Sequence, residues 1–424
     1  MLMSLQLIYG PSGSGKSYTL YKKIIEQSIR EPDREFIVIV PEQFTMQTQR
    51  ELVELHPNRG ILNIDVQSFL RLAWRIFEEV GVDTHTVLED TGKNLLLRRV
   101  ASRQKNDLTV LGRNFRKPGY ISQVKSIISE LKQYDVSLEE LDEQLRSGKK
   151  DALSCKLQDI RNLYEGFQEE LQGKYITSEE ILEELCYVVK KSEILKGCVV
   201  ALDGFTGFTP IQNKLLRELM QTAEKIYVTV TLDAWEDPMK KVSMHKLSYL
   251  SKKTIQQLAG AAKECGCMLE KPEVLGKEGS IRFRSAPALR FLERHLFRPG
   301  NQIYEAQDSQ KLERELSLHV ARDAKAEAEF AARTIWHLVR EENLRYRDIA
   351  VITGDMESFG DHMKKELQQK GIPCFIDRTR KLLLNPLVEF LRAALQIAAK
   401  SFRYESMFRY LRTGLAGLKK DEID

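Results

Sequence analysis

Long apolar runs, closely spaced cysteines and a strong charge of one sign are all missing from this sequence of 424 residues. No run approaches the roughly 18 apolar residues that a membrane-spanning helix requires, so no membrane partner is expected. Residues 1–7 lack the charged start and the apolar stretch of a signal peptide. The six cysteines form no C-x-x-C pair, which predicts reduced thiols in a cytoplasmic protein.

The composition is that of an ordinary globular protein, with 42% hydrophobic and 30% charged residues. The length suffices for roughly two to four domains. A net charge of +4 permits nucleic-acid binding without indicating it. The last residues, 419–424, carry no closing element, so we expect the chain to be the front piece of something longer.

A glycine-rich stretch stands out near the start. Gly10–Ser17 reads GPSGSGKS and matches G-x-x-x-x-G-K-[ST] at every fixed position, between the apolar run 5–9 and a helical pattern through 30. The glycines let backbone N–H groups point at phosphates, Lys16 adds a positive charge, and the Ser17 hydroxyl can hold Mg²⁺. The alternative is a chance match in a turn. The pattern predicts a nucleoside triphosphate site made of Gly10, Pro11, Ser12, Gly13, Ser14, Gly15, Lys16 and Ser17.

Alternating strand and helix patterns predict an α/β fold with an open parallel sheet. The continuous apolar runs 36–40 and 198–203 are typical of buried parallel strands, and 61–66 and 225–231 follow suit. Between them, residues 81–195 are mostly helical, which predicts an all-α insertion. Its expected helices cover 92–101, 121–134, 138–145, 154–171 and 178–191.

The sequence divides into four parts on these patterns. Residues 1–80 and 196–275 form a discontinuous P-loop domain around the insertion 81–195, and 276–310 is a linker. Residues 311–424 are the start of a second α/β domain that the chain does not finish. Its expected strands are 316–321, 348–353 and 372–376.

A carboxylate near the P-loop is the next requirement of a Mg²⁺–nucleotide site. The best candidate is Asp203, at the end of the strand 198–203, although a simple turn aspartate is the alternative. Hydrolytic P-loop motors usually place a glutamate directly after this aspartate, to activate water. Here that residue is Gly204, which cannot act as a base.

The order of four segments resembles successive motifs of the UvrD-type superfamily 1 helicases. These segments are GPSGSGKS, VPEQFTMQTQREL, IDVQSFLRLAWRIF and VVALDGFTGFTPIQ. More closely, essentially the whole chain resembles the N-terminal part of the AddB family, the B subunits of ATP-dependent helicase/deoxyribonucleases. The segments 119–121 and 129–132 support this match, as does LDGFTGFTPIQ where a motor reads roughly DExQD. The resemblance implies RecA-like domains that bind ATP and Mg²⁺.

Three departures from the motor pattern predict nucleotide binding without efficient turnover, and therefore no catalytic residue. Gly204 replaces the catalytic acid, the segment 228–233 lacks the glutamine that senses the γ-phosphate, and Gly354 stands where an arginine is usual. The alternative is an active superfamily 1 DNA helicase motor. A P-loop kinase is a weaker alternative, which the helical insertion and second α/β domain disfavour.

Single-stranded DNA is expected to cross the loops that follow the strands of such a sheet. Aromatic side chains there can stack on bases, and polar ones can contact base edges. The alternative for Phe69 and Trp74 is a core position on an amphipathic helix. The candidate DNA-binding residues are Gln43, Thr45, Phe69, Arg71, Trp74, Phe205 and Phe208.

The resemblance also implies a biological setting. Members of the AddB family form a heterodimer with an active helicase–nuclease, the A subunit of the complex. This heterodimer acts on single- and double-stranded DNA and processes double-strand breaks for homologous recombination. The AddB protein is implicated in recognition of a Chi-type sequence. A 5′–3′ exonuclease domain with a [4Fe–4S] cluster lies further along the family's chain, and no ligands for that cluster are expected here.

Overall fold

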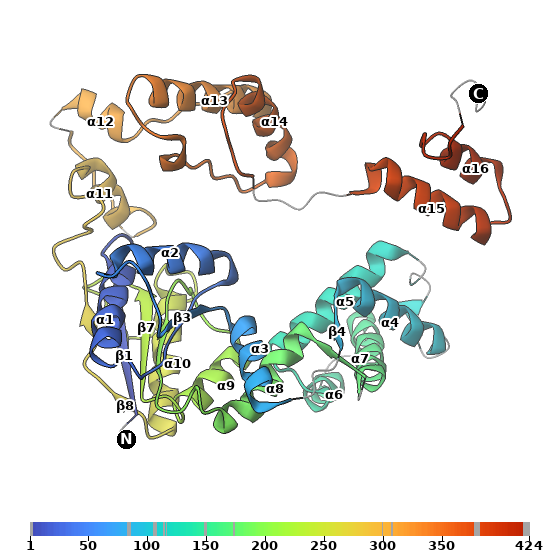
Figure 1. The fold of residues 1–424 in the computed structure, drawn as a ribbon, viewed down its shortest axis with the longest axis horizontal. Helices are drawn as coiled ribbons and strands as arrows, with labels where there is room; N and C mark the ends of the chain where they lie inside the picture. Colours follow the sequence, from blue (N-terminus) through green and yellow to red (C-terminus); the bar gives the residue numbers. More distant parts are fainter. Residues whose placement is uncertain are drawn as a thin grey trace. The chain divides into compact units, whose positions relative to one another are not determined.

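The computed structural model describes residues 3–82, 86–104, 108–112, 115, 117–147, 151–172, 174–298, 300–306, 308–376 and 382–418 (Figure 1). Contacts divide the chain into two units, Met1–Leu316 and Ser317–Asp424. Among the described helices, none is long and apolar enough to cross a membrane. The tail 419–424, assigned above to a second domain, lies outside the described residues.

A parallel sheet forms the centre of the first unit. Its strand order is β3-β2-β6-β7-β1-β8, and β9 also pairs with β1. The strands are β1 (Ser4–Gly10), β2 (Phe36–Ile39), β3 (Ile64–Gln67), β6 (Val199–Leu202), β7 (Lys225–Thr231), β8 (Met268–Leu269) and β9 (Glu273–Val274). The predicted α/β fold with a parallel sheet is therefore confirmed. The short strands β8 and β9 were not expected.

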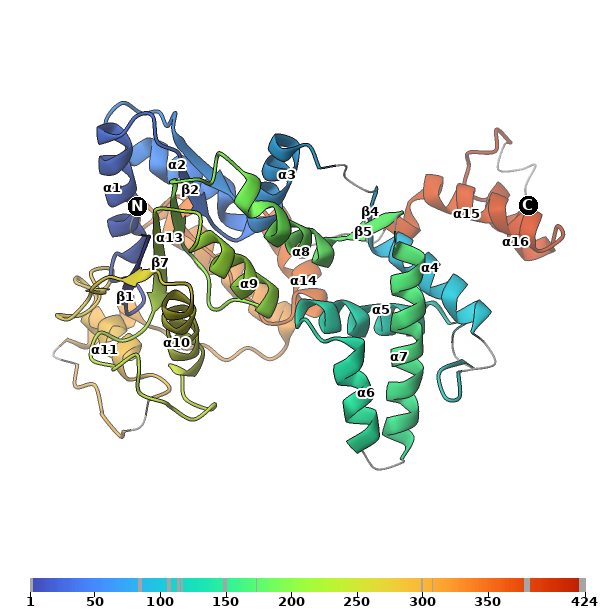
Figure 2. The same cartoon turned by 90° about the horizontal axis from the view of Figure 1, so that it is seen from below.

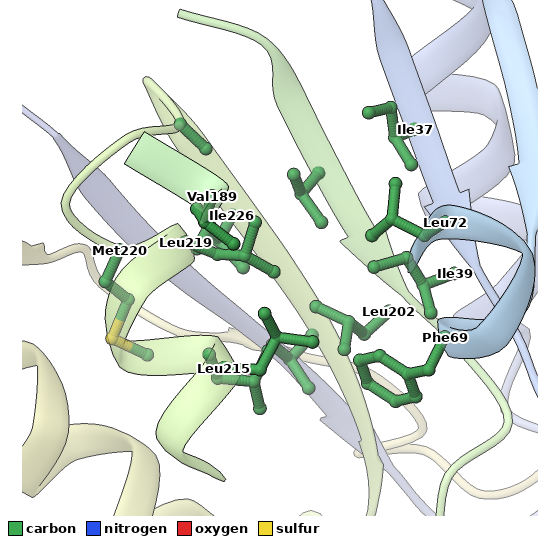
Figure 3. Close-up of a cluster of buried hydrophobic side chains, with 14 of the residues drawn as sticks. Ile37, Ile39, Phe69, Leu72, Val189, Leu202, Leu215, Leu219, Met220 and Ile226 are labelled. Carbon is green, nitrogen blue, oxygen red and sulfur yellow. The ribbon is translucent and has the colours of Figure 1, made fainter. Parts of the chain in front are cut away.

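Side chains alternate between two buried faces of this sheet, which explains the continuous apolar runs. Leu7 of β1 faces one core and Ile8 faces the other. The first core lies under α3 (Phe69–Val80), α8 (Ser178–Val188), α9 (Pro210–Leu219) and α10 (Tyr249–Glu264). Figure 3 shows side chains of α3 and α9 meeting those of the strands. The second core lies under α1 (Lys16–Arg30) and α2 (Thr45–Leu55).

Local sequence signals set where several helices begin. The Ser68 hydroxyl accepts the N–H of Arg71 and caps α3, as predicted. Thr177 and Glu180 form the expected reciprocal capping box at α8. The α2 segment is preceded by a 3₁₀ turn, η1 (Glu42–Phe44), and α8 continues into η3 (Val189–Lys191). These caps fix where the chain enters two helices that cover the first core.

The helical insertion has a core of its own (Figure 2). It consists of α4 (Asp90–Arg103), α5 (Pro118–Gln133), α6 (Leu138–Ser147) and α7 (Ala152–Leu171). The expectation of an all-α insertion is wrong in one detail, because β4 (Thr86–Leu88) and β5 (Tyr175–Thr177) pair in parallel. These strands are where the chain enters and leaves the helical bundle. Their pairing satisfies backbone groups that loops would expose.

The second unit is helical in the described residues. It contains α13 (Ala324–Arg340), η4 (Tyr346–Asp348), α14 (Met356–Gln369), η5 (Leu382–Leu384), α15 (Pro386–Ala399) and α16 (Tyr404–Leu411). The strands expected at 316–321, 348–353 and 372–376 do not form. Leu318 and Ile352 are instead 92% and 93% exposed. A strand without hydrogen-bonded neighbours is not stable, so local β propensity is insufficient here.

The region expected to be a linker, 276–310, is not structureless. It contains α11 (Pro287–His295) and leads into α12 (Ser309–Glu315), and both belong to the first unit. The Glu315 carboxylate accepts the N–H of Ala288 at 2.8 Å, which ties the two helices together.

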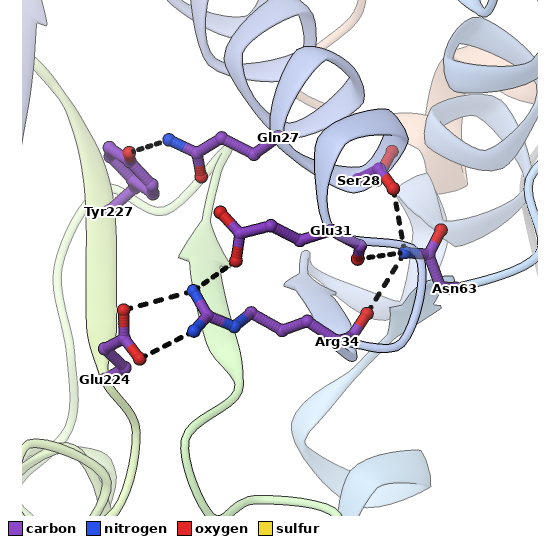
Figure 4. A network of polar contacts seen from close by, with 7 residues as sticks. All are labelled: Gln27, Ser28, Glu31, Arg34, Asn63, Glu224 and Tyr227. Carbon is purple, nitrogen blue, oxygen red and sulfur yellow. Dashed lines mark hydrogen bonds and ion pairs between the residues drawn. The ribbon is translucent and has the colours of Figure 1, made fainter. Parts of the chain in front are cut away.

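A polar network at one edge of the sheet joins the end of α1 to β7 (Figure 4). Arg34 makes two parallel hydrogen bonds to Glu224, of 3.1 and 2.8 Å, and pairs with Glu31 at 2.6 Å. The Asn63 amide donates to three backbone carbonyls, those of Ser28, Glu31 and Arg34. The network fixes this edge and leaves the opposite edge to the loops.

We expect Arg34→Ala to lower the free energy of unfolding by about 1–2 kcal/mol, because it removes a bidentate, partly buried ion pair. Arg50→Ala is the matched control, since Arg50 is 71% exposed and pairs with Glu54 on its own helix. The control should cost less than about 0.5 kcal/mol. Urea titrations of both variants check this, and equal losses would contradict the structural role of Arg34.

Candidate functional site

The carboxyl ends of the parallel strands bring the candidate site residues to one edge of the sheet. The P-loop follows β1, the segment from Glu42 follows β2, and Ser68 follows β3. Asp203 follows β6, which lies next to β2, and Asp233 follows β7, which lies next to β1. Ligands of such sheets bind at this edge.

The P-loop has the conformation that phosphate binding requires. Gly13 and Gly15 take φ values of 72° and 90°, which other residues rarely adopt. Helix α1 starts at Lys16 with Gly15 as its N-cap, and no side chain caps it. The Ser14 hydroxyl is buried and has no hydrogen-bond partner among the described residues. Uncapped N–H groups and an unpaired buried hydroxyl fit a bound phosphate.

Lys16 is folded onto the loop that carries it. Its Nζ donates to the carbonyls of Gly10 and Pro11, at 3.1 and 2.9 Å. Burial lowers the pKa of Lys16; the positive charge of Arg282 also lowers it, and the Asp203 carboxylate opposes both. The ammonium is therefore a poorly solvated cation beside the loop, which an anion would stabilise.

The segment after β9 packs directly against the P-loop. The Arg282 N–H donates to the carbonyl of Gly13 at 3.1 Å, and the Leu275 N–H donates to that of Tyr9 at 2.8 Å. A Cβ at Gly13 would lie 2.6 Å from the Ser280 hydroxyl oxygen. Sequence reasoning treated Arg282 as part of a solvated loop and missed this contact. Only the contact itself, between residues far apart in the chain, could have revealed it.

Asp203 is buried, and both of its oxygens are engaged. The Tyr21 hydroxyl donates to Oδ2 at 2.7 Å, and the Thr229 hydroxyl donates to Oδ1 at 2.5 Å. Burial, together with the Asp203 charge, raises the pKa of Tyr21, so the phenol remains a donor. Among the described residues, no three acidic, histidine or cysteine side chains come together as a metal site. Asp203 therefore does not fit a direct Mg²⁺ ligand in this arrangement, whereas Ser17 at the start of α1 does.

A second ion pair closes the edge beyond β7. Arg298 makes two hydrogen bonds to Asp233, of 2.9 and 2.8 Å. The pair borders a hollow of about 440 Å³ that opens beside Pro11 and Ser12. Burial raises the pKa of Glu293 on α11, and Lys16 is among the cations that oppose the rise. Sequence reasoning missed all three charged residues.

The aromatic candidates divide into a cluster and a separate tryptophan. The Phe69 ring lies 5.4 Å from Phe205 and 6.5 Å from Phe208, and the last two are 5.2 Å apart. Phe69 is buried in the core, while Phe205 and Phe208 are half-buried against it. Trp74 is 38% exposed and packs edge-on against Phe77. The cluster can offer the faces of Phe205 and Phe208 only in part.

The polar candidates surround the loop after β2. Gln43 is exposed, and the exposed Arg71 pairs with Glu42 at 3.0 Å. The Thr45 hydroxyl is buried and donates to the carbonyl of Glu42 at 3.0 Å. A groove of about 410 Å³ runs past Glu42, and Phe205 also lines it. Arg71 and Gln43 therefore present polar groups outward, and Thr45 does not.

Comparison with known proteins identifies the family. The family model "ADDB, N-terminal" matches residues 7–293. The ATP-dependent helicase/deoxyribonuclease B subunit of Lachnoclostridium phytofermentans is 46% identical, over all of this chain and 37% of the relative. The corresponding B subunits of Clostridium novyi and Clostridium tetani are 34% and 35% identical, over all of this chain and 36% of each. The chain thus spans little more than a third of the length of these relatives. It belongs to the AddB family of ATP-dependent helicase/deoxyribonuclease B subunits and corresponds to their N-terminal part.

Proposed function

We propose that the chain is the nucleotide- and DNA-binding front of an AddB protein, in a helicase–nuclease that processes double-strand DNA breaks for homologous recombination. The observation that carries ATP binding is the P-loop, with its uncapped helix start, its unpaired Ser14 hydroxyl and the poorly solvated Lys16. The relatives' names, which include ATP dependence, helicase and deoxyribonuclease, support the same assignment.

The module holds ATP rather than turning it over efficiently. Gly204 stands where a motor carries its general base, and its φ of 79° suits glycine. The preceding Asp203 is already engaged by two hydroxyls. The intact P-loop is the observation that favours the alternative, an active superfamily 1 motor.

The DNA strand crosses the edge of the sheet, where Gln43 and Arg71 point outward beside the groove lined by Phe205. Side chains of this kind contact base edges and stack on bases. A module that does not step can keep such contacts, so we assign it a part in recognising a Chi-type sequence.

The remaining assignments rest on the family. The partner is an active helicase–nuclease, the A subunit of a cytoplasmic heterodimer. The 5′–3′ exonuclease and its [4Fe–4S] cluster belong to the part of the AddB protein that follows this chain. The relatives are named as one lettered component of an enzyme, which supports the existence of such a partner.

We expect Arg71→Ala in the full complex to abolish the pause at the regulatory sequence while unwinding and nuclease rates stay within about twofold, because the exposed guanidinium contacts bases and not the reacting groups. Phe205→Ala should act in the same direction through lost stacking, worth about 1–3 kcal/mol per base. Single-molecule translocation assays on DNA with and without the sequence measure the effect.

Arg50→Ala is the matched control, because Arg50 is an exposed arginine on the neighbouring helix α2. It should leave both the rate and the pause unchanged. If the Arg71 variant slows unwinding as much as it reduces the pause, the residue only grips the strand and the reading role is refuted.

A further inference from the structure

We propose that Tyr21 occupies the place of a metal at Asp203, so that this P-loop binds nucleotide with little dependence on Mg²⁺. The inference rests on the proposed nucleotide binding and concerns how the site neutralises the phosphates. It departs from the expectation that Asp203 holds the metal.

The first support is the geometry around the carboxylate. The Tyr21 and Thr229 hydroxyls each take one oxygen of Asp203, at 2.7 and 2.5 Å. The three side chains, Tyr21, Thr229 and Asp203, are buried, at 3%, 5% and 6% exposed. Hydrogen bonds from hydroxyls to a carboxylate are charge-assisted and roughly twice as strong as neutral ones. The aspartate is therefore stabilised without a cation.

The second support is the position of Tyr21 in the chain. It lies four residues after Ser17 on α1, so the two side chains share one face of the helix. The Thr48 hydroxyl lies 3.4 Å from the phenol oxygen on the other side. The phenol is thus held between α1, α2 and the end of β6, one helical turn from the serine that a bound metal would contact.

A metal would have to displace these bonds. Mg²⁺ takes oxygen ligands at about 2.0–2.1 Å in a strict octahedron. Direct coordination by Asp203 would leave the buried Tyr21 hydroxyl without its acceptor, which costs about 1–3 kcal/mol. Binding through Ser17, water and the phosphates remains open to the metal, but gains nothing from the carboxylate.

Two protein cations can take over part of the neutralisation. Lys16 lies on the loop, and the Arg282 charge is close enough to lower the pKa of Lys16. The Arg282 backbone is fixed to Gly13 of the loop. Phosphates between these cations would relieve their repulsion, which supplies the charge compensation that Mg²⁺ otherwise gives to the phosphates.

The test is the affinity of this chain for ATP, measured by calorimetry in Mg²⁺ and in EDTA. The wild type should differ by less than about threefold between the two conditions, whereas Tyr21→Phe should bind at least about tenfold more tightly in Mg²⁺. Tyr18→Phe is the matched control, since Tyr18 lies on the same helix and is 57% exposed. It should behave as the wild type.

Thermal melting shows whether Tyr21→Phe is folded, and Thr229→Val, which frees the other oxygen, is the second variant with the same expected result. A wild type that loses tenfold or more in EDTA overturns the inference while leaving the proposed function intact. A folded Tyr21→Phe and Thr229→Val that stay independent of Mg²⁺ also overturn it. Failure to bind ATP in either condition refutes the proposed function itself.

Discussion

Lys16→Ala should weaken ATP binding by the chain at least about tenfold, because a hydrogen bond to a charged group contributes about 1.5–3 kcal/mol. The expected effect is large, since Lys16 Nζ already lies over the loop carbonyls of Gly10 and Pro11 and only has to turn toward the phosphates. Its burial means that the empty site holds a cation poor in solvent contacts. Calorimetry of both proteins with ATP measures the change.

Lys22→Ala is the control for this variant. Lys22 lies on the same helix α1, is 64% exposed and lies 3.9 Å from the Glu26 carboxylate. Its removal changes the net charge by the same amount and should leave the affinity within about twofold. Equal affinities of wild type and Lys16→Ala would refute the P-loop as the nucleotide site.

The second large effect concerns turnover. With single-stranded DNA present, the chain should hydrolyse ATP about 10²–10⁴-fold more slowly than a motor with a positioned general base, because Gly204 supplies none. Adding the missing carboxylate by Gly204→Glu should not restore the rate. The backbone there has φ 79°, and a Cβ would lie 3.4 Å from the Pro41 ring. The neighbouring Asp203 would also remain bound to two hydroxyls.

Gly197→Glu is the matched control for strain. Gly197 has φ 71° with no atom within 4 Å of a built Cβ, and it lies just before β6, at the end of the strand away from the loops. Both variants should lose about 1–3 kcal/mol of stability, as non-glycine residues at positive φ do. Steady-state ATPase assays and thermal melts separate the two effects. A Gly204→Glu variant with motor-like turnover would show that only the base is missing.

The P-loop domain was predictable because its signals are local. The run Phe36–Ile39 reads as a strand buried on both faces, and the glycines of Gly10–Ser17 indicate a loop with unusual φ values. The capping residues Ser68 and Thr177 mark helix starts within a few residues of sequence. Strand order did not enter these predictions, and it came from the fold.

The strands of the second unit could not be predicted reliably, because strand formation depends on partners elsewhere in the chain. The segments 316–321 and 348–353 have the right composition, yet no described strand pairs with them. In the first unit the same composition succeeds, because β6 lies between β2 and β7. Sequence patterns report propensity, while pairing decides the outcome.

The contacts that define the candidate site are equally non-local. Tyr21 and Asp203 are 182 residues apart, and the sequence pattern marked Asp203 only as a strand-end carboxylate. Phe69 was weighed as either a DNA contact or a core residue, and the rings that contact it come from Phe205 and Phe208, far along the chain. The roles of these aromatic residues in DNA binding stay predictions.

The central claim, that the module holds ATP without using it, is tested most directly by one measurement. The chain is mixed with radiolabelled ATP and single-stranded DNA, and the protein-bound nucleotide is separated and identified over time. The account predicts that the bound label is recovered as ATP over many minutes. Recovery of the label as ADP, with turnover of several per second, would contradict the account and establish an active motor.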